Sequence, residues 1–145
     1  MNSNSDNPKV GKVFQQIALR FVTEYFDKRF IEEKSIDIGY PPKPHKFDIV
    51  SEDGLIVVEC KCYTWTEGGN VPSAKMATLD EAILYMNNIP YTAQKIIILK
   101  QVFHPEKDIT LAEYFVDKKG HLMRDVSVWE LADNWDFRVI RDKGY

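Results

Sequence analysis

Apolar residues near the start of the chain recur at the spacing of an α-helix. Asn7-Pro8 is typical of a helix cap followed by a first turn. From there apolar side chains return every three or four residues as far as about Arg29. The residues of this stripe are Val10, Phe14, Ile17, Ala18, Phe21, Tyr25 and Phe26. The pattern predicts one amphipathic helix, preceded over residues 1–6 by a polar tail that we expect to be disordered.

The next segment has the shorter apolar runs that are typical of strands. A first strand is predicted over 36–40, ended by the proline-rich run 41–44. Two further strands, over 47–50 and 55–63, are joined by the polar turn Ser51-Glu52-Asp53-Gly54. Because Gly54 readily adopts a positive φ, this turn favours an antiparallel hairpin.

The second half of the chain alternates between helical and strand-like patterns. Ile96 to Leu99 is a continuous apolar run, which indicates a strand that is buried on both faces. The predicted elements are a helix over 74–88, a strand over 95–100, a helix capped by Asp108 and ended by Gly120, a short helix or strand over 126–131, and a closing strand over 137–141. This order predicts an α/β fold, in which helices cover both faces of a mixed sheet.

Composition and length agree with one soluble domain over residues 1–145. Hydrophobic residues make up 44% and charged residues 28% of the chain, as in ordinary globular proteins. No apolar run reaches the length of a membrane span, so we expect no membrane association. The cysteines Cys60 and Cys62 are two apart on one strand, which favours buried thiols over a disulfide or a zinc site and fits a reducing cytoplasm.

The residues with the clearest chemical potential lie between positions 48 and 61. Glu59 and Lys61 share one face of an apolar strand, where unpaired charges are costly to bury. Pairing Val50 with Leu55 would set Asp48 opposite Val57, with Glu59 on the diagonal about 7–8 Å away. Two carboxylates at that distance can share a cation, and Mg²⁺ prefers such oxygen ligands. Lys61 could hold a water molecule or stabilise charge that develops on phosphorus.

Asp48 and the tripeptide Glu59-Cys60-Lys61 resemble the motif of the PD-(D/E)xK nuclease superfamily, although Phe47 stands where that motif usually has proline. The resemblance covers roughly residues 10 to 100. It implies a restriction-endonuclease-like fold with an αβββαβ core and a small C-terminal α/β extension. It also implies an endonuclease that uses Mg²⁺, or Mn²⁺, to cleave nucleic acid, with DNA as the expected substrate. In this family Asp48 and Glu59 would ligate the metal, the Cys60 carbonyl would be a further ligand, and Lys61 would act on the attacking water.

Four other residues are candidates for supporting roles. Gln15 occupies the helix position where the family often has an acid, which favours a single metal ion or an inactive relative that serves as a binding or assembly module. His45, Trp65 and Lys75 flank the motif and could contact substrate, but a loop histidine, a packing tryptophan and a solvated lysine are the alternatives. Glu59 and Lys61 could also simply form a buried ion pair, or serve an enzyme with another substrate.

Partners follow from the same reasoning. A net charge of −3 is a weak indication against nucleic-acid binding, because metal-binding carboxylates contribute to it themselves. A duplex has two strands to cut, so a homodimer or a larger complex is an expected assembly.

Overall fold

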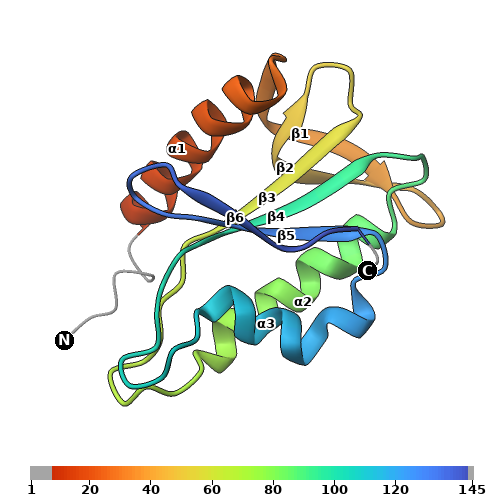
Figure 1. Ribbon diagram of the computed structural model, residues 1–145. Coiled ribbons are helices and arrows are strands. Elements are labelled where there is room, and N and C mark those ends of the chain that lie inside the picture. Colours follow the sequence, from red (N-terminus) through yellow and green to blue (C-terminus); the bar gives the residue numbers. More distant parts are fainter. Residues whose placement is uncertain (1–7, 144–145) are drawn as a thin grey trace.

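The computed structural model describes residues 8–143, so the tail predicted over residues 1–6 lies outside the described residues. The described residues form a six-stranded mixed sheet with helices on both faces (Figure 1), which confirms the α/β class. The strands are β1 (Phe30–Ile38), β2 (Lys43–Ser51), β3 (Ile56–Lys61), β4 (Gln94–Lys100), β5 (Val126–Leu131) and β6 (Phe137–Arg141). The helices are α1 (Pro8–Phe26), α2 (Ser73–Asn87) and α3 (Leu111–Lys119), and the short 3₁₀ helix η2 (Gly120–Leu122) follows α3.

The strands lie side by side in chain order from β1 to β6. Strands β3, β4 and β5 are parallel to one another, whereas the β1–β2, β2–β3 and β5–β6 pairs are antiparallel. Parallel neighbours need a crossover connection, and α2 and α3 provide the two crossovers. The first six elements therefore run helix, three strands, helix, strand, and β5 and β6 extend the same sheet.

Helix α1 covers one face of the sheet alone (Figure 1). The middle of its predicted apolar stripe is buried, because Phe14, Ala18 and Phe21 belong to one core cluster with β-strand residues such as Val58 and Ile96. Tyr25, near the end of the stripe, is 51% exposed. The helix ends at Phe26, earlier than the stripe predicts, because Asp27 adopts a positive φ of 51° that a continuing α-helix does not allow. Among the described residues, no helix is long and apolar enough to cross a membrane.

Helices α2 and α3 cover the opposite face (Figure 1). There they form a core cluster with sheet residues such as Val57 and Ile97. Helix α2 lies within one residue of its predicted range, and the predicted double burial of the apolar run in β4 is confirmed. Residues 126–131, for which the sequence predicts either a short helix or a strand, form β5. The predicted cap of α3 is wrong: Thr110, not Asp108, caps the helix, because its side chain and that of Glu113 each accept the other residue's backbone N–H.

The first strand is longer than the sequence pattern predicts. Strand β1 begins at Phe30 instead of residue 36, and it pairs with β2 along nearly its full length. The prediction misses its first half because the charged run of residues 32–34 interrupts the apolar pattern of this edge strand. Strand β2 also begins earlier than predicted, at Lys43 within the proline-rich run.

The register of the β2–β3 hairpin differs from the predicted one by two residues. Val50, and not Asp48, lies opposite Val57. The connection is longer than the pairing of Val50 with Leu55 allows, because the Ser51 hydroxyl accepts the Ile56 N–H at 2.9 Å and so closes a wider turn. The predicted positive φ at Gly54 is confirmed at 77°. The corrected register brings Asp48 level with Glu59 instead of diagonal to it.

Candidate functional site

Strands β2 and β3 separate at Asp48 and Glu59, and we call this place the fork. The two strands pair at Ile49–Val58 and Val50–Val57. Beyond these pairs β2 continues beside β1, and β3 continues beside β4. A strand that leaves its neighbour exposes backbone donors that need new acceptors.

The two acidic side chains supply those acceptors. The Asp48 N–H donates to Glu59 Oε1 at 3.0 Å, and the Cys60 N–H donates to Asp48 Oδ2 at 2.9 Å. Each carboxyl group therefore binds the backbone of the opposite strand at the point where the ladder stops. This reciprocal arrangement fixes both acids close together at the base of the fork.

A local irregularity in β2 helps to place Asp48. Phe47 and Val50 pack toward α2 and α3, whereas Ile49 packs toward α1. Residues two apart on a regular strand share a face, so β2 changes faces at Asp48. In β1, directly across the sheet, Glu33 has a positive φ of 54°. Positive φ at a residue other than glycine is uncommon and often marks a functional site.

The two carboxyl groups at the fork do not ionise independently. Burial raises the pKa of Glu59 to about 8, and the negative charge of Asp48 adds to this effect. Burial also raises the pKa of Asp48, although the hydrogen bond from the Cys60 backbone works against it. Two carboxyl groups held this close favour one proton between them over two negative charges. At neutral pH the pair therefore holds one shared proton in a buried position.

Lys61, the last residue of β3, lies beside this pair. Its Nζ is 4.0 Å from Glu59 Oε2, and its side chain is 21% exposed. Burial works to lower the pKa of Lys61, but Tyr63, Glu59 and Asp48 outweigh it and raise the pKa above its ordinary value. Lys61 is therefore a cation that partly balances the charge of the carboxyl pair. This contact fits both a buried ion pair and a catalytic lysine.

Gln15 reaches the fork from α1. Its side-chain Nε2 donates to Glu32 Oε2 at 2.9 Å and to Glu33 Oε2 at 3.1 Å, and it lies 3.4 Å from the Asp48 carbonyl oxygen. Gln15 thus places an amide in contact with two acids on β1. The negative charge of Glu33 is one of the causes that raise the pKa of Asp48.

Glu32 and Glu33 are neighbours of the site that sequence reasoning missed. Their segment was not predicted to be a strand, so nothing placed them beside Asp48. The available signal is the pair of consecutive acids that stands two residues before the strand predicted over 36–40. Tyr63, which the sequence places directly after the motif, lies two residues beyond the end of β3 and is one of the causes that raise the pKa of Lys61.

His45 belongs to β2 and Lys75 belongs to α2. The His45 ring stacks on Tyr85 of α2 with centroids 3.9 Å apart, and burial lowers its pKa. Both Asp48 and Lys61 influence that pKa, so His45 lies within electrostatic range of the site. Lys75, in the first turn of α2, places its Nζ 5.8 Å from the centre of the Tyr63 ring.

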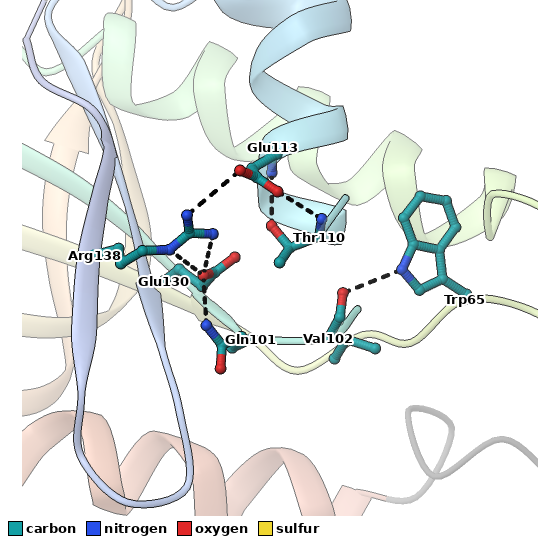
Figure 2. Close-up of polar contacts among 7 residues, drawn as sticks. All are labelled: Trp65, Gln101, Val102, Thr110, Glu113, Glu130 and Arg138. Carbon is teal, nitrogen blue, oxygen red and sulfur yellow. Dashed lines mark hydrogen bonds and ion pairs between the residues drawn. The ribbon is translucent and has the colours of Figure 1, made fainter. Parts of the chain in front are cut away.

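Trp65 lies apart from the fork and packs into the core. Its indole N–H donates to the Val102 carbonyl at 3.1 Å (Figure 2), and its ring meets the edges of His104 and Tyr114. The side chain is buried, with 9% of the residue exposed. The structure thus places Trp65 as the packing alternative describes.

A second buried carboxylate, that of Glu130 on β5, was not singled out in the sequence. Glu130 Oε1 accepts hydrogen bonds from Arg138 and from Gln101, and Arg138 also contacts Glu113 (Figure 2). Its second oxygen, Oε2, is buried and has no hydrogen-bond partner among the described residues. Arginine and amide donors neutralise this carboxylate, so the cluster is typical of a structural ion pair.

The donor set at the fork suits a hard cation. Among residues 8–143 there is no group of three or more His, Cys, Asp or Glu side chains arranged to hold a metal ion. A cation at the fork would therefore have two carboxylates, with a backbone carbonyl, water and substrate as its other ligands. Mg²⁺ is commonly held in this way, and a divalent ion could replace the proton that Asp48 and Glu59 share.

Comparison of the chain with known protein families, with curated proteins and with solved structures finds no match. The function is therefore inferred from the residues at the fork and from the order of the elements that carry them.

Proposed function

We propose that this protein is a Mg²⁺-dependent phosphodiesterase that cleaves nucleic acid, with DNA as the expected substrate. The observation that carries the proposal is the buried Asp48–Glu59 carboxyl pair, whose members bind each other's strands beside the ammonium of Lys61. Strongly perturbed acids of this kind are concentrated at functional sites. We further propose membership of the PD-(D/E)xK superfamily with its restriction-endonuclease-like fold, and the helix, three strands, helix, strand order supports it.

The proposed roles follow from the geometry of the fork. Asp48 and Glu59 would hold the cation, with the Cys60 carbonyl as a further ligand. The bound cation would supply charge stabilisation at the phosphate and would favour deprotonation of water. Lys61 directs its ammonium toward the same carboxylates, so it can orient the attacking water and balance negative charge on the phosphate oxygens. Mn²⁺ would occupy the same oxygen ligands.

A single cation is favoured over two because Gln15 supplies an amide and not a carboxylate. The same contact supports a second candidate function, a catalytically inactive module for binding or assembly. In that case the Gln15 amide, which already contacts Glu32 and Glu33, would stabilise the acids of the fork without a metal.

A first experiment separates these functions by metal binding. Isothermal titration of Mn²⁺ into the wild type and into the Asp48→Ala/Glu59→Ala variant should show binding to the wild type only. Glu52→Gln, an exposed acid in the turn of the same hairpin, is the matched control and should bind as the wild type does. Circular dichroism must show that all three proteins are folded. A folded wild type that does not bind Mn²⁺ would favour the inactive module.

A second experiment identifies the substrate. Labelled single- and double-stranded DNA and RNA of one sequence are incubated with the wild type, Lys61→Met and Glu52→Gln in Mg²⁺. Cleavage by the wild type and Glu52→Gln, with loss in Lys61→Met, is the expected result. Sedimentation of the wild type with uncleaved duplex tests the expected homodimer. Binding without cleavage under every condition would identify the alternative function.

A further inference from the structure

The β1–β2 hairpin ends in a turn that is exposed along its whole length. The two strands pair as far as Ile38 and Lys43. All six residues from 39 to 44 are exposed, and Tyr40 is 99% exposed. We call residues 39–44 the tip, which is the orange turn at the right-hand edge of the molecule in Figure 1.

The tip is held in place although it is exposed. The Gly39 N–H donates to the Asn88 carbonyl, just after α2, at 3.2 Å. Next to the tip, the His45 ring stacks on Tyr85 of α2 with centroids 3.9 Å apart. Half of the tip residues are prolines, whose rings fix φ. The tip is therefore a preformed projection, which can contact a partner at a low cost in conformational entropy.

The lysines of this hairpin carry charge that the chain does not neutralise. Residues 34–46 contain three lysines and one acid, in a protein whose net charge is −3. Among the described residues, Lys34, Lys43 and Lys46 form no ion pair, whereas lysines elsewhere, such as Lys28 and Lys95, do. A local excess of unpaired ammonium groups complements the phosphates of a nucleic acid.

The two exposed lysines project from opposite faces of the hairpin. Lys43 and Lys46 are an odd number of residues apart on a stretch of β2 that pairs regularly with β1. Tyr40 lies beyond both, at the end of the hairpin. A narrow projection with a lysine on each face fits a groove, because phosphates of the two strands line its two sides.

The dimensions of the hairpin favour one kind of groove. The major groove of B-form DNA is about 12 Å wide and admits a two-stranded β-ribbon. Its depth of about 8.5 Å is comparable to the length of three strand residues, which separate Lys46 from the start of β2. The major groove of A-form RNA is too narrow for side chains to read. The hairpin therefore fits double-stranded DNA better than double-stranded RNA.

We propose that the tip is an arm that enters the major groove of a DNA duplex, with Tyr40 at the base edges and with Lys43 and Lys46 at phosphates on the two sides. This role rests on the proposed function, and it names double-stranded DNA as the substrate at the fork. Strand β2 joins the tip to Asp48 directly. The five residues from Lys43 to Asp48 span about 17 Å, which is about half a turn of the duplex.

Fluorescence anisotropy of a labelled DNA duplex, in EDTA and again in Ca²⁺, tests the arm without cleavage. Lys43→Gln/Lys46→Gln should lower the affinity by roughly 10-fold and reduce the slope of log K against log salt by about 2, because two phosphate contacts are lost. Tyr40→Ala should also lower the affinity by roughly 10-fold, but with an unchanged slope, because it removes no charge.

Matched controls remove the same groups elsewhere. Lys118→Gln/Lys119→Gln removes two lysines of α3, and Phe103→Ala removes an aromatic side chain that is 56% exposed. Both should bind the duplex as the wild type does. Wild-type affinity in the folded arm variants overturns the inference, and so does a wild type that binds duplex DNA in neither buffer. An equal loss of affinity for single-stranded DNA or for duplex RNA of the same sequence also overturns it, because no B-form groove would then be involved.

The arm and the fork can fail separately. If the wild type binds Mn²⁺ and cleaves DNA while the arm variants keep their affinity, the arm is wrong and the proposed function stands. If the arm variants lose affinity for the duplex but the wild type neither binds Mn²⁺ nor cleaves, the proposed catalysis fails and the arm stands. The protein would then be the binding module that is the alternative function.

Discussion

Two buried glutamates on neighbouring parts of one sheet have opposite surroundings. Glu59 on β3 is 7% exposed and Glu130 on β5 is 1% exposed, and both point toward the face that α2 and α3 cover. Glu130 meets donors, since Arg138 binds it at 2.7 and 2.9 Å and Gln101 binds it at 3.0 Å (Figure 2). Glu59 instead meets another carboxyl group, and its nearest cation is 4.0 Å away.

This difference separates a carboxylate whose charge is balanced from one whose charge is opposed. The hydrogen bond with Glu130 is the main cause that raises the pKa of Arg138, so each partner stabilises the charge of the other. At the fork the charges oppose each other, and the pair must keep a proton unless a cation enters. Acids that are perturbed as strongly as this pair are concentrated at sites of binding or chemistry, which supports the function proposed for the fork. Burial alone would not have distinguished the two glutamates.

The largest expected effect is the pH dependence of stability that Glu59 causes. Its pKa of about 8 in the folded protein lies above the ordinary value of 4.5, so the folded state binds the proton more tightly. Its contribution to the free energy of unfolding is therefore complete below pH 4.5 and is lost as the pH rises to 8, by up to about 4 kcal/mol. Urea titrations of the wild type and Glu59→Gln in metal-free buffer at several pH values measure this contribution. Parallel curves for the two proteins would contradict it.

Removal of Arg138 should have the next largest effect. Arg138→Met leaves the Glu130 carboxylate buried with only Gln101 as donor, which should cost about 3 kcal/mol of unfolding free energy. Lys61→Met, the same change at the fork, should cost less than about 1 kcal/mol, because the acid pair can stay protonated. Chemical denaturation at pH 7 compares the two variants. If Lys61→Met were as destabilising as Arg138→Met, Glu59 and Lys61 would be an ordinary buried ion pair.

The sequence predicts the fork better than it predicts the surroundings of the fork. The alternation of β3 correctly places Glu59 and Lys61 on one face, because side-chain direction in a strand depends only on local geometry. The register with β2 could not be predicted, because it depends on a hydrogen bond between the Ser51 hydroxyl and the backbone of Ile56. The contact of Gln15 with Asp48 likewise requires the packing of α1 on the sheet, which no local pattern specifies.

The Glu130 cluster shows the same limit more strongly. In the sequence Glu130 is one acid within the pattern Val-Ser-Val-Trp-Glu-Leu, which fits a helix or a strand. Its burial follows only once β6 brings Arg138 opposite it. Similarly, half of β1 was missed because the charged run of residues 32–34 leaves no apolar signal. The role of a residue cannot be predicted from local sequence when it depends on a partner that is distant along the chain.

Metal binding should make the fork more stable without affecting the Glu130 cluster. If Mn²⁺ binds the folded protein only, a concentration about thirty times its Kd should add about 2 kcal/mol to the unfolding free energy. The effect should be larger at pH 8.5 than at pH 6, because the ion must displace the shared proton. Asp48→Asn should abolish the increase, and Arg138→Met should retain it on a lower baseline. Thermal unfolding with and without Mn²⁺ tests this, and an equal increase in Asp48→Asn would place the metal elsewhere.

The smallest expected effect concerns the cap of α3, which connects to the Glu130 cluster. Thr110 and Glu113 form a capping box, and Glu113 also contacts Arg138 at 3.4 Å (Figure 2). Thr110→Ala should cost about 1 kcal/mol through the lost cap. If the cap and the ion pair are one network, Thr110→Ala should destabilise less in an Arg138→Met background than in the wild type, and a double-mutant cycle measures that difference.

The same Thr110→Ala change should leave Mn²⁺ affinity unchanged, since none of these contacts reaches Asp48 or Glu59. A change in Mn²⁺ affinity would show that the two glutamate sites are coupled through the sheet, and the balanced and the opposed carboxylate could then no longer be treated as independent.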